Sequence, residues 1–212
     1  RKGLFMGAQA IVFDIGNVLI EWVPERYYDR AYGSDVRKRL FAEVDLHGMN
    51  DAIDRGGNFR NTVYACAEDY PEFSDMIRDW HDHWIELAAP VIPKSVRCLR
   101  ALRAKNIPVF ALTNFGIESF AYARSIYRFL EEFDQAFVSG HMGMIKPDPQ
   151  IYAMVEEACG VPASGLLFAD DKLENIEAAK ARGWQVHHFT GPEGWAERLV
   201  AEGFLSHEEI RP

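Results

Sequence analysis

The sequence predicts an α/β fold: a doubly wound parallel sheet with a small helical domain inserted after the first strand. Short apolar runs end abruptly at polar residues, which is typical of parallel strands buried on both faces. Helical patterns alternate with these runs from about residue 92 to the end of the chain, as in a sheet built from strand–helix–strand units. Residues 21–91 interrupt the alternation, because their patterns are helical and include no convincing strand.

Five apolar runs are the predicted strands, and the last of them is the weakest. In chain order they cover residues 10–13, 107–112, 135–138, 166–169 and 185–189. The helices expected between and after them cover residues 94–105, 118–131, 149–159, 173–182 and 192–201. Gly160 and Gly183 directly follow two of these helices, and glycine commonly occupies the position just beyond a helix end.

The helical insertion is predicted to form a small domain of residues 21–91, while residues 1–20 and 92–212 form the sheet domain. Its expected helices cover residues 24–32, 34–46, 59–68 and 72–87. Glycines mark breaks in this stretch, namely Gly33, Gly48 and Gly56-Gly57. The insertion has 8 basic and 15 acidic residues, so its net charge of −7 is most of the whole chain's −9. This shift in composition supports the two boundaries.

Composition excludes several classes of partner. With 23 basic and 32 acidic residues, the chain has no positive surplus to displace the counterions of nucleic acid. It has no run of about 18 apolar residues, so we expect no membrane partner. The three cysteines are far apart and form no CxxC pair, and residues 1–9 lack the apolar stretch of a signal peptide. We therefore expect a cytoplasmic protein, of an oligomeric state that the sequence does not indicate.

Side chains able to do chemistry follow the predicted strands. They are Asp14, Thr113, Ser139, Lys146 and the pair Asp170-Asp171. Open α/β sheets bind ligands outside the carboxyl ends of their strands, so these side chains would converge on one edge of the sheet if the strands are neighbours. Carboxylates, a hydroxyl and an ammonium at one edge predict a reactive site there.

Four segments of the chain carry a family resemblance. They are Phe13-Asp14-Ile15-Gly16-Asn17-Val18-Leu19, Leu112-Thr113-Asn114, the stretch 146–152, and Phe168-Ala169-Asp170-Asp171. In order and spacing, and over nearly the whole chain, they resemble the motifs of the haloacid dehalogenase-like (HAD) hydrolase superfamily. The resemblance implies a Rossmann-like core and makes the helical insertion a cap that closes over the site and selects the substrate. The chain would then hinge near Glu21 and Val91.

The resemblance implies covalent phosphoryl transfer, with Asp14, Thr113 and Lys146 as the catalytic residues. The Asp14 carboxylate would attack phosphorus in line, and water would then hydrolyse the aspartyl-phosphate. Lys146 would neutralise charge on the nucleophile and on the transferred group. Thr113 would donate its hydroxyl to a phosphate oxygen, close to the backbone amide of Asn114. Asn17, Thr113, Asn114 and Lys146 are thus the expected substrate-binding residues.

A magnesium ion is the predicted cofactor, because Asp14 and an incoming phosphate repel each other. Mg²⁺ prefers one or two carboxylates, phosphate oxygens and waters. By the family's pattern the ion would be held by Asp14, the backbone carbonyl of Gly16 and Asp171, with Asp170 binding directly or through water. The other interpretation of the Asp170-Asp171 pair is a cap for the following helix, where aspartate is favoured in any case.

Gly16 departs from the family's pattern. Most phosphatases of the superfamily have a second aspartate there, two residues after the nucleophile, as the general acid for the leaving group. Loss of such a donor typically slows a reaction by about 10²–10⁴-fold. Three interpretations remain open: a leaving group such as an anomeric oxygen departs unaided, the cap supplies a donor such as His47, or the reaction is not phosphoryl transfer.

The sequence therefore predicts a Mg²⁺-dependent phosphomonoesterase for a small phosphorylated metabolite, with a sugar phosphate as one candidate. The first alternative is a 2-haloacid dehalogenase that uses Asp14 without a metal, because halide needs no proton to leave. The pair Asp170-Asp171 favours the phosphatase, since dehalogenases tend to lack an acidic metal site. The second alternative is a non-catalytic binder of a phosphorylated ligand. The acidic insertion favours small monoesters over long polyanions.

Overall fold

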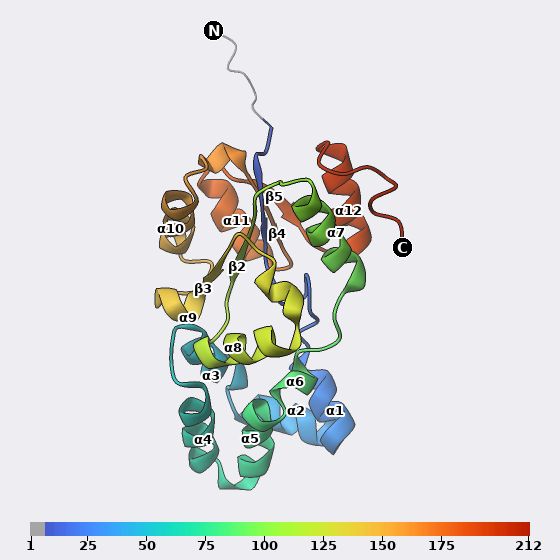
Figure 1. Ribbon diagram of the computed structural model, residues 1–212. Coiled ribbons are helices and arrows are strands. Elements are labelled where there is room, and N and C mark those ends of the chain that lie inside the picture. Colours follow the sequence, from blue (N-terminus) through green and yellow to red (C-terminus); the bar gives the residue numbers. More distant parts are fainter. Residues whose placement is uncertain (1–6) are drawn as a thin grey trace.

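A computed structural model of the protein describes residues 7–212 and centres on a five-stranded parallel sheet (Figure 1). Its strands are β1 (Ala10–Phe13), β2 (Val109–Thr113), β3 (Gln135–Val138), β4 (Leu166–Asp170) and β5 (Gln185–His188). They lie in the order β3-β2-β1-β4-β5, so the first strand of the chain is in the middle of the sheet. The predicted fold class is confirmed. Residues 1–6 of the predicted sheet domain lie outside the described residues.

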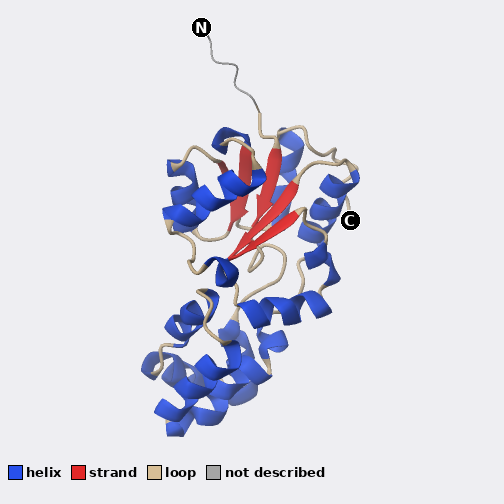
Figure 2. Ribbon diagram, turned by 60° about the vertical axis from the view of Figure 1, so that its left-hand side comes forward, coloured by secondary structure: helices blue, strands red, loops and turns tan. Residues whose placement is uncertain are grey.

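Helices cover both faces of the sheet (Figure 2). One apolar core cluster includes residues of α7 (Pro93–Ala104), α8 (Ile117–Ile126) and α12 (Pro192–Ala201), and the other includes residues of α10 (Pro149–Cys159) and α11 (Leu173–Ala181). On β1, Ile11 and Phe13 belong to the first cluster, whereas Ala10 and Val12 belong to the second. All four are completely buried, which explains why the strand is a continuous apolar run in the sequence.

The helices of the insertion form a layer at the carboxyl edge of the sheet (Figures 1 and 2). They are α1 (Pro24–Tyr32), α2 (Ser34–Glu43), α3 (Leu46–Asp54), α4 (Phe59–Asp69), α5 (Ser74–Asp82) and α6 (Trp84–Leu87), with a 3₁₀ turn, Pro71–Phe73, before α5. The chain enters and leaves this helical layer side by side, because Ile20 pairs with Val91 and the Glu21 N–H donates to the Pro90 carbonyl at 2.9 Å. Among residues 7–212, no helix has the length and apolar character needed to cross a membrane.

The insertion contains one helix that the sequence does not predict as a separate element. Helix α2 ends at Glu43, and α3 begins at Leu46 and runs through Gly48 to Asp54. Asp45 is the N-cap of α3, and its carboxylate accepts a hydrogen bond from the Gly48 N–H at 2.9 Å. A Cβ atom on residue 48 would overlap this carboxylate, so any other residue there would displace the cap. Gly48 thus lies in the first turn of a helix and not in a break between helices.

Three smaller differences concern the helices: two predicted helices are divided or shortened, and one short helix is additional. The predicted helix 72–87 is divided at His83, whose φ of −116° lies outside the helical region. The predicted helix 118–131 ends at Ile126 and is followed by a 3₁₀ turn, Arg128–Glu131. A one-turn helix, α9 (Ser139–Met142), directly follows β3 and has no counterpart among the predicted elements.

Gly48→Ala tests the N-cap of α3. Alanine normally stabilises a helix relative to glycine by about 0.5–1 kcal/mol, but here its methyl group would displace a cap of about 1 kcal/mol. We expect no gain in the free energy of unfolding in the wild type. In an Asp45→Ala background, the same substitution should stabilise by about 0.5–1 kcal/mol. Urea unfolding of the four proteins measures this coupling, and equal effects in both backgrounds would contradict the overlap.

Candidate active site

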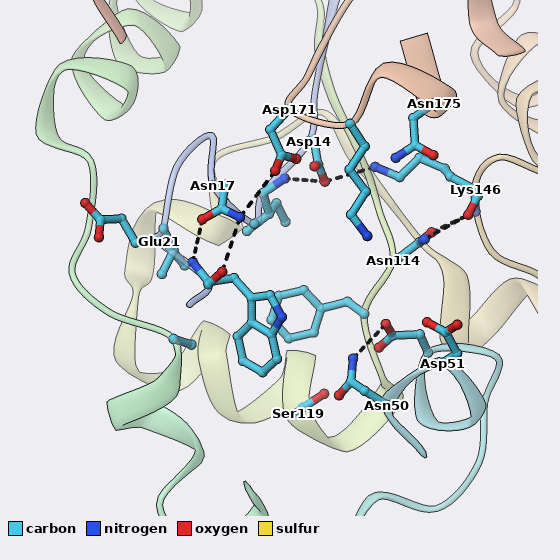
Figure 3. A pocket seen from close by; sticks show the side chains of 18 of the residues that line it. Asp14, Asn17, Glu21, Asn50, Asp51, Asn114, Ser119, Lys146, Asp171 and Asn175 are labelled. Carbon is cyan, nitrogen blue, oxygen red and sulfur yellow. Dashed lines mark hydrogen bonds and ion pairs between the residues drawn. The ribbon is translucent and has the colours of Figure 1, made fainter. Parts of the chain in front are cut away.

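A cavity of about 270 Å³ lies between the carboxyl edge of the sheet and the helical layer (Figure 3). Its wall on the sheet side includes Asp14, Asn17, Asn114, Lys146 and Asp171. Its wall on the helical side includes Trp22, His47, Asn50, Asp51, Asp54 and Trp84. The cavity adjoins the ends of β1 and β4, between which the order of the strands reverses, and open α/β sheets bind ligands at such a point.

Asp14 follows β1 and is only 7% exposed. Its Oδ1 accepts a hydrogen bond from the Ile15 N–H at 2.8 Å and lies 2.9 Å from Lys146 Nζ. Burial raises the pKa of Asp14 well above its usual range, and the charge of Asp170 adds to this rise while Lys146 opposes it. Its Oδ2 accepts no hydrogen bond from residues 7–212, so one oxygen of the carboxylate is held and the other is free to meet a ligand.

Lys146 is buried, and three oxygens lie within hydrogen-bonding distance of its ammonium. Nζ lies 2.9 Å from Asp14 Oδ1, 2.7 Å from Asp170 Oδ2 and 2.9 Å from the carbonyl of Leu112. Burial lowers the pKa of Lys146, but the two carboxylates raise it more, so the side chain stays charged. Asn114 holds the peptide of Lys146, since Asn114 Oδ1 accepts from its N–H at 2.8 Å and Nδ2 donates to its carbonyl at 3.0 Å.

Asp170, the last residue of β4, is completely buried and surrounded by donors. Its Oδ2 accepts from Lys146 Nζ and, at 3.0 Å, from Asn175 Nδ2. Its Oδ1 accepts from the backbone N–H of Lys172 at 2.8 Å. The side chain of Lys172 itself lines the cavity. Asp170 therefore orients the ammonium of Lys146 and the start of the loop that follows β4.

The carboxylates of Asp14, Asp170 and Asp171 form an acidic cluster in which one oxygen from each lies within 4.8 Å of the others. Asp171 faces the cavity, and burial and the charge of Asp170 raise its pKa. One lysine ammonium balances only part of the charge of three carboxylates. Carboxylate oxygens are also the ligands that Mg²⁺ prefers. The donor set therefore fits a divalent cation, and Gly16 lines the cavity beside it.

Asn17 lies in the loop after β1, in a left-handed conformation with φ of 59° that asparagine tolerates. Its Oδ1 accepts from the Trp22 N–H at 2.8 Å, and its Nδ2 donates to the Trp22 carbonyl and to Asp171 Oδ2, each at 3.2 Å. Asn17 thus lines the cavity, as a substrate-binding residue would, while its side chain holds the loop and orients the carboxylate of Asp171.

Thr113 and Ser139, the two hydroxyl residues at strand ends, do not line the cavity. Thr113 is buried at the end of β2 and is not part of the cavity wall, whereas the next residue, Asn114, is. Ser139 is also buried, and its Oγ donates to the carbonyl of Asp54 at 2.6 Å and accepts from the Phe115 N–H at 2.8 Å. Ser139 therefore ties the helical layer to the sheet domain and does not face the cavity.

Helix α3 supplies cavity residues that the sequence analysis does not single out. Asn50 Nδ2 donates to Asp54 Oδ2 at 3.0 Å, and Asn50 Oδ1 accepts from Trp80 Nε1 at 3.0 Å. Asp54 is only 8% exposed, and burial, followed by the charge of Asp51, raises its pKa to about 7. The helical spacing of residues 47, 50 or 51, and 54 is the signal that could have placed these side chains on one face.

His47, the cap donor suggested by the sequence, lines the same cavity. Its side chain is 60% exposed, and Nε2 lies 3.2 Å from Glu25 Oε1. Trp22 and Trp84 form an aromatic part of the wall, with ring centroids 6.2 Å apart. The helical side of the cavity thus combines aromatic faces with carboxyl and amide groups.

The parallel sheet and the acidic cluster with its buried lysine define an α/β protein whose chemically reactive side chains gather at the carboxyl ends of the strands. The model of the haloacid dehalogenase-like hydrolase family matches residues 8–183, and the chain belongs to this family. The helical layer stands where the family resemblance implies a cap. Membership in the family makes the protein a hydrolase, as the sequence predicts.

Several relatives are phosphatases by name. The sesquiterpene phosphatase astK of Aspergillus oryzae is 36% identical over 92 residues, which are 43% of this chain and 47% of that protein. The phosphorylated carbohydrates phosphatase of Thermotoga maritima is 24% identical over 191 residues, 82% of each chain. The chain spans about half or less of the length of the first curated relatives that it matches.

A HAD family enzyme from Bacteroides thetaiotaomicron, solved in complex with magnesium and inorganic phosphate, has the same fold. It aligns with a TM-score of 0.72 over 91% of this chain and 99% of that chain, at 21% identity. A likeness at this level of identity concerns the fold alone.

Proposed function

We propose that the protein is a Mg²⁺-dependent phosphomonoesterase that acts on a small phosphorylated metabolite through an aspartyl-phosphate on Asp14. The observation that carries the proposal is the buried pairing of Asp14 with Lys146 at a cavity that also holds Asp171. A carboxylate buried at such a site requires a functional reason, because burial disfavours its charged form.

In the proposed reaction, an oxygen of Asp14 attacks phosphorus and displaces the ester oxygen, and water then cleaves the aspartyl-phosphate. Lys146 stabilises the negative charge on the transferred group, while Asp170 keeps its ammonium in place. Asn17 and Asn114 bind substrate from the cavity wall. Thr113, the last residue of β2, would donate its hydroxyl to a phosphate oxygen.

The metal would be held by Asp14, the carbonyl of Gly16 and Asp171. We propose that Asp170 acts through water, because Lys146, Asn175 and the Lys172 N–H already occupy its oxygens. When bound, Mg²⁺ would offset the repulsion between the carboxylates and a phosphate and would polarise the phosphoryl oxygens.

A sugar phosphate is the substrate class that we favour. The aromatic faces of Trp22 and Trp84 suit the apolar face of a sugar ring, and Asn50 and Asp51 offer hydrogen-bonding groups for its hydroxyls. The relative from T. maritima acts on phosphorylated carbohydrates by name. The cytoplasm is the compartment that we propose for this reaction, in keeping with three unpaired cysteine thiols.

The 2-haloacid dehalogenase remains the second candidate, because it needs only the nucleophile Asp14 and no proton for its halide. It is disfavoured by the acidic cluster, since a 2-haloacid carries a carboxylate of its own that Asp170 and Asp171 would repel. A non-catalytic binder of phosphorylated ligands is the third candidate.

A panel of substrates distinguishes the three candidates. We expect phosphate release from p-nitrophenyl phosphate, hexose phosphates or glycerol phosphates with Mg²⁺, and loss of this activity in EDTA that is restored by added Mg²⁺. Halide release from 2-chloropropionate in EDTA would instead support the dehalogenase. Binding of tungstate, a phosphate analogue, without turnover of any ester would support the non-catalytic binder.

A further inference from the structure

Within residues 7–212, the sheet-domain wall of the cavity offers no free carboxyl that could protonate the leaving group. Residue 16, which lines the cavity two positions after Asp14, is glycine and offers no side chain. On the sheet side, the carboxyls nearest to the nucleophile are those of the acidic cluster, Asp170 and Asp171, which the proposed function assigns to Lys146 and the metal. A donor for the ester oxygen must therefore come from elsewhere in the cavity wall.

Asp54, the last residue of α3, is a buried carboxyl in the opposite wall. Figure 3 shows Asn50 and Asp51 of the same helix across the cavity from Asp14 and Asp171. Asp54 Oδ2 accepts a hydrogen bond from Asn50 Nδ2 at 3.0 Å.

Hydrogen bonds fix both the partner of the Asp54 side chain and the backbone of Asp54. Asn50 is itself held by Trp80 Nε1 at 3.0 Å, and the backbone carbonyl of Asp54 accepts from the Oγ of Ser139, at the end of β3, at 2.6 Å. The side chain of Asp54 is thus held by the helical layer, and its backbone is held by the sheet domain. This anchoring suits a residue that must meet a substrate bound between the two.

Four charged groups act on Asp54. Asp51 and Arg55 come from its own segment, and Lys146 and Lys172 face it from the sheet domain. Burial, followed by Asp51, raises the pKa of Asp54 to about 7, against the opposing effect of the three cations. At neutral pH the carboxyl therefore exists in both forms, which a group that gives and takes protons requires.

We propose that Asp54 is the general acid of the phosphoryl transfer, in place of the aspartate that Gly16 lacks. In the first step a bond forms between Asp14 and phosphorus, and the bond from phosphorus to the ester oxygen breaks. Its electron pair stays on that oxygen, which takes the proton of Asp54 and leaves as the alcohol. In the second step a water oxygen attacks phosphorus and gives a proton to the Asp54 carboxylate. The bond from phosphorus to the Asp14 oxygen breaks, and its electron pair stays on the Asp14 carboxylate, so both aspartates are restored and phosphate is released.

The other titratable groups on the helical side of the cavity, Glu21, His47 and Asp51, are less suited to this role. Glu21 is partly exposed, and its Oε2 is held by Arg26 at 2.6 Å. His47 is largely exposed, and its Nε2 is engaged by Glu25. Asp51 is exposed to solvent on the same helix, one turn from Asp54. Asp51 also raises the pKa of Asp54, so it is no control. Asp75, on α5, offers a matched control, because Asp75→Asn removes a 94% exposed carboxylate of the helical layer that neither lines the cavity nor acts on Asp54.

The test compares leaving groups, and it rests on the proposed phosphatase function. For the alkyl phosphate that the wild type hydrolyses fastest, Asp54→Asn should lower kcat/KM by about 10²–10⁴-fold. For p-nitrophenyl phosphate, whose leaving group needs little protonation, the same variant should lose less than about tenfold. Asp75→Asn should leave kcat/KM within about twofold of the wild type for both esters. Asp54→Glu should regain part of the loss for the alkyl ester.

The pH profile adds a readout that a purely structural role would not move. In the wild type, kcat/KM for the alkyl ester should fall as pH rises through about 7, because the acid form of Asp54 is lost. Asp54→Asn should lack this fall on the same substrate. The wild-type profile requires no variant, so it tests the inference even if Asp54→Asn does not fold.

Three results would overturn the inference: equal losses for both esters in Asp54→Asn, no loss for the alkyl ester, or a wild type that hydrolyses only p-nitrophenyl phosphate. Absence of phosphate release from every ester in the wild type would instead refute the proposed function. The urea midpoint of Asp54→Asn at pH 8 should not lie below that of the wild type, since the wild type buries an ionised carboxylate at that pH.

Discussion

Asp14→Asn should lower kcat for phosphomonoester hydrolysis by roughly 10⁴-fold or more, because an amide cannot act as the nucleophile. The substitution keeps the size of the side chain and its place beside Ile15 and Lys146. It also removes a carboxylate whose charged form is disfavoured by burial and by Asp170. Steady-state kinetics with p-nitrophenyl phosphate, together with circular dichroism to verify the fold, measure the effect.

The matched control is Asp75→Asn. Asp75 lies in the first turn of α5, and its side chain is 94% exposed. The same chemical change there should leave kcat within about twofold of the wild type, because surface substitutions away from special features rarely perturb the protein. Comparable activities of Asp14→Asn and the wild type would remove Asp14 as the nucleophile.

Lys146→Met should lower the free energy of unfolding by about 3–5 kcal/mol and kcat by about 10²-fold or more. The loss of stability arises because two buried carboxylates, Asp14 and Asp170, would lose their shared cation. The pKa of Lys146 is raised in the folded protein, so its contribution is present up to the pKa of an unfolded lysine, about 10.4. It is lost only as the pH rises through the raised value.

Asp170→Asn in the Lys146→Met background isolates this pairing. The double variant should be more stable than Lys146→Met, because it no longer buries an unpaired Asp170 carboxylate. Lys38→Met, at an exposed position of α2, should change stability by no more than about 0.5 kcal/mol. Urea unfolding at pH 7 compares all four proteins. A Lys146→Met protein as stable as the wild type would show that the buried ion pairs contribute no net stability.

The strands could be predicted from the sequence because their physical signal is strong. Complete burial on both faces makes β1 and β4 continuous apolar runs, and each run ends where the chain reaches the cavity edge. Even the weaker run at 185–189 corresponds to β5. Helix α3 gives no comparable signal. A glycine normally indicates a break between helices, and Gly48 lies in the first turn of α3. Only the contact with Asp45 explains why a glycine is found in a helix there.

The same distinction, between a local sequence signal and contacts made by distant segments, separates the site residues that could be predicted from those that could not. Asp14, Lys146 and Asp171 could be predicted because they follow strands whose ends share one edge of the sheet. Asp54 could not, because its role depends on burial by distant parts of the chain. Its helical spacing from His47 and Asn50 places it on one face of α3 but does not show that this face lines a cavity. The side chain of Asn114 is a similar case. Its two hydrogen bonds to the Lys146 peptide span 32 positions of sequence.

The helical layer links the proposed chemistry to substrate choice. On its side of the cavity it contributes the carboxyls of Glu21, Asp51 and Asp54, so a phosphate would approach past acidic groups. Lys146, Lys172 and a bound cation would provide the attraction at the reacting end. This arrangement favours esters with one phosphate and a neutral remainder. It accounts for a small-molecule phosphatase better than for an enzyme that acts on polyanions.

Trapping of the covalent intermediate tests the central claim most directly. The protein is mixed with p-nitrophenyl phosphate and Mg²⁺, quenched in acid and treated with borohydride, which reduces an aspartyl-phosphate to homoserine. Peptide mass spectrometry then locates the modified residue. We expect homoserine at position 14 with substrate and none without it. Phosphate release with no modification at position 14, or modification of another carboxylate, would contradict nucleophilic catalysis by Asp14.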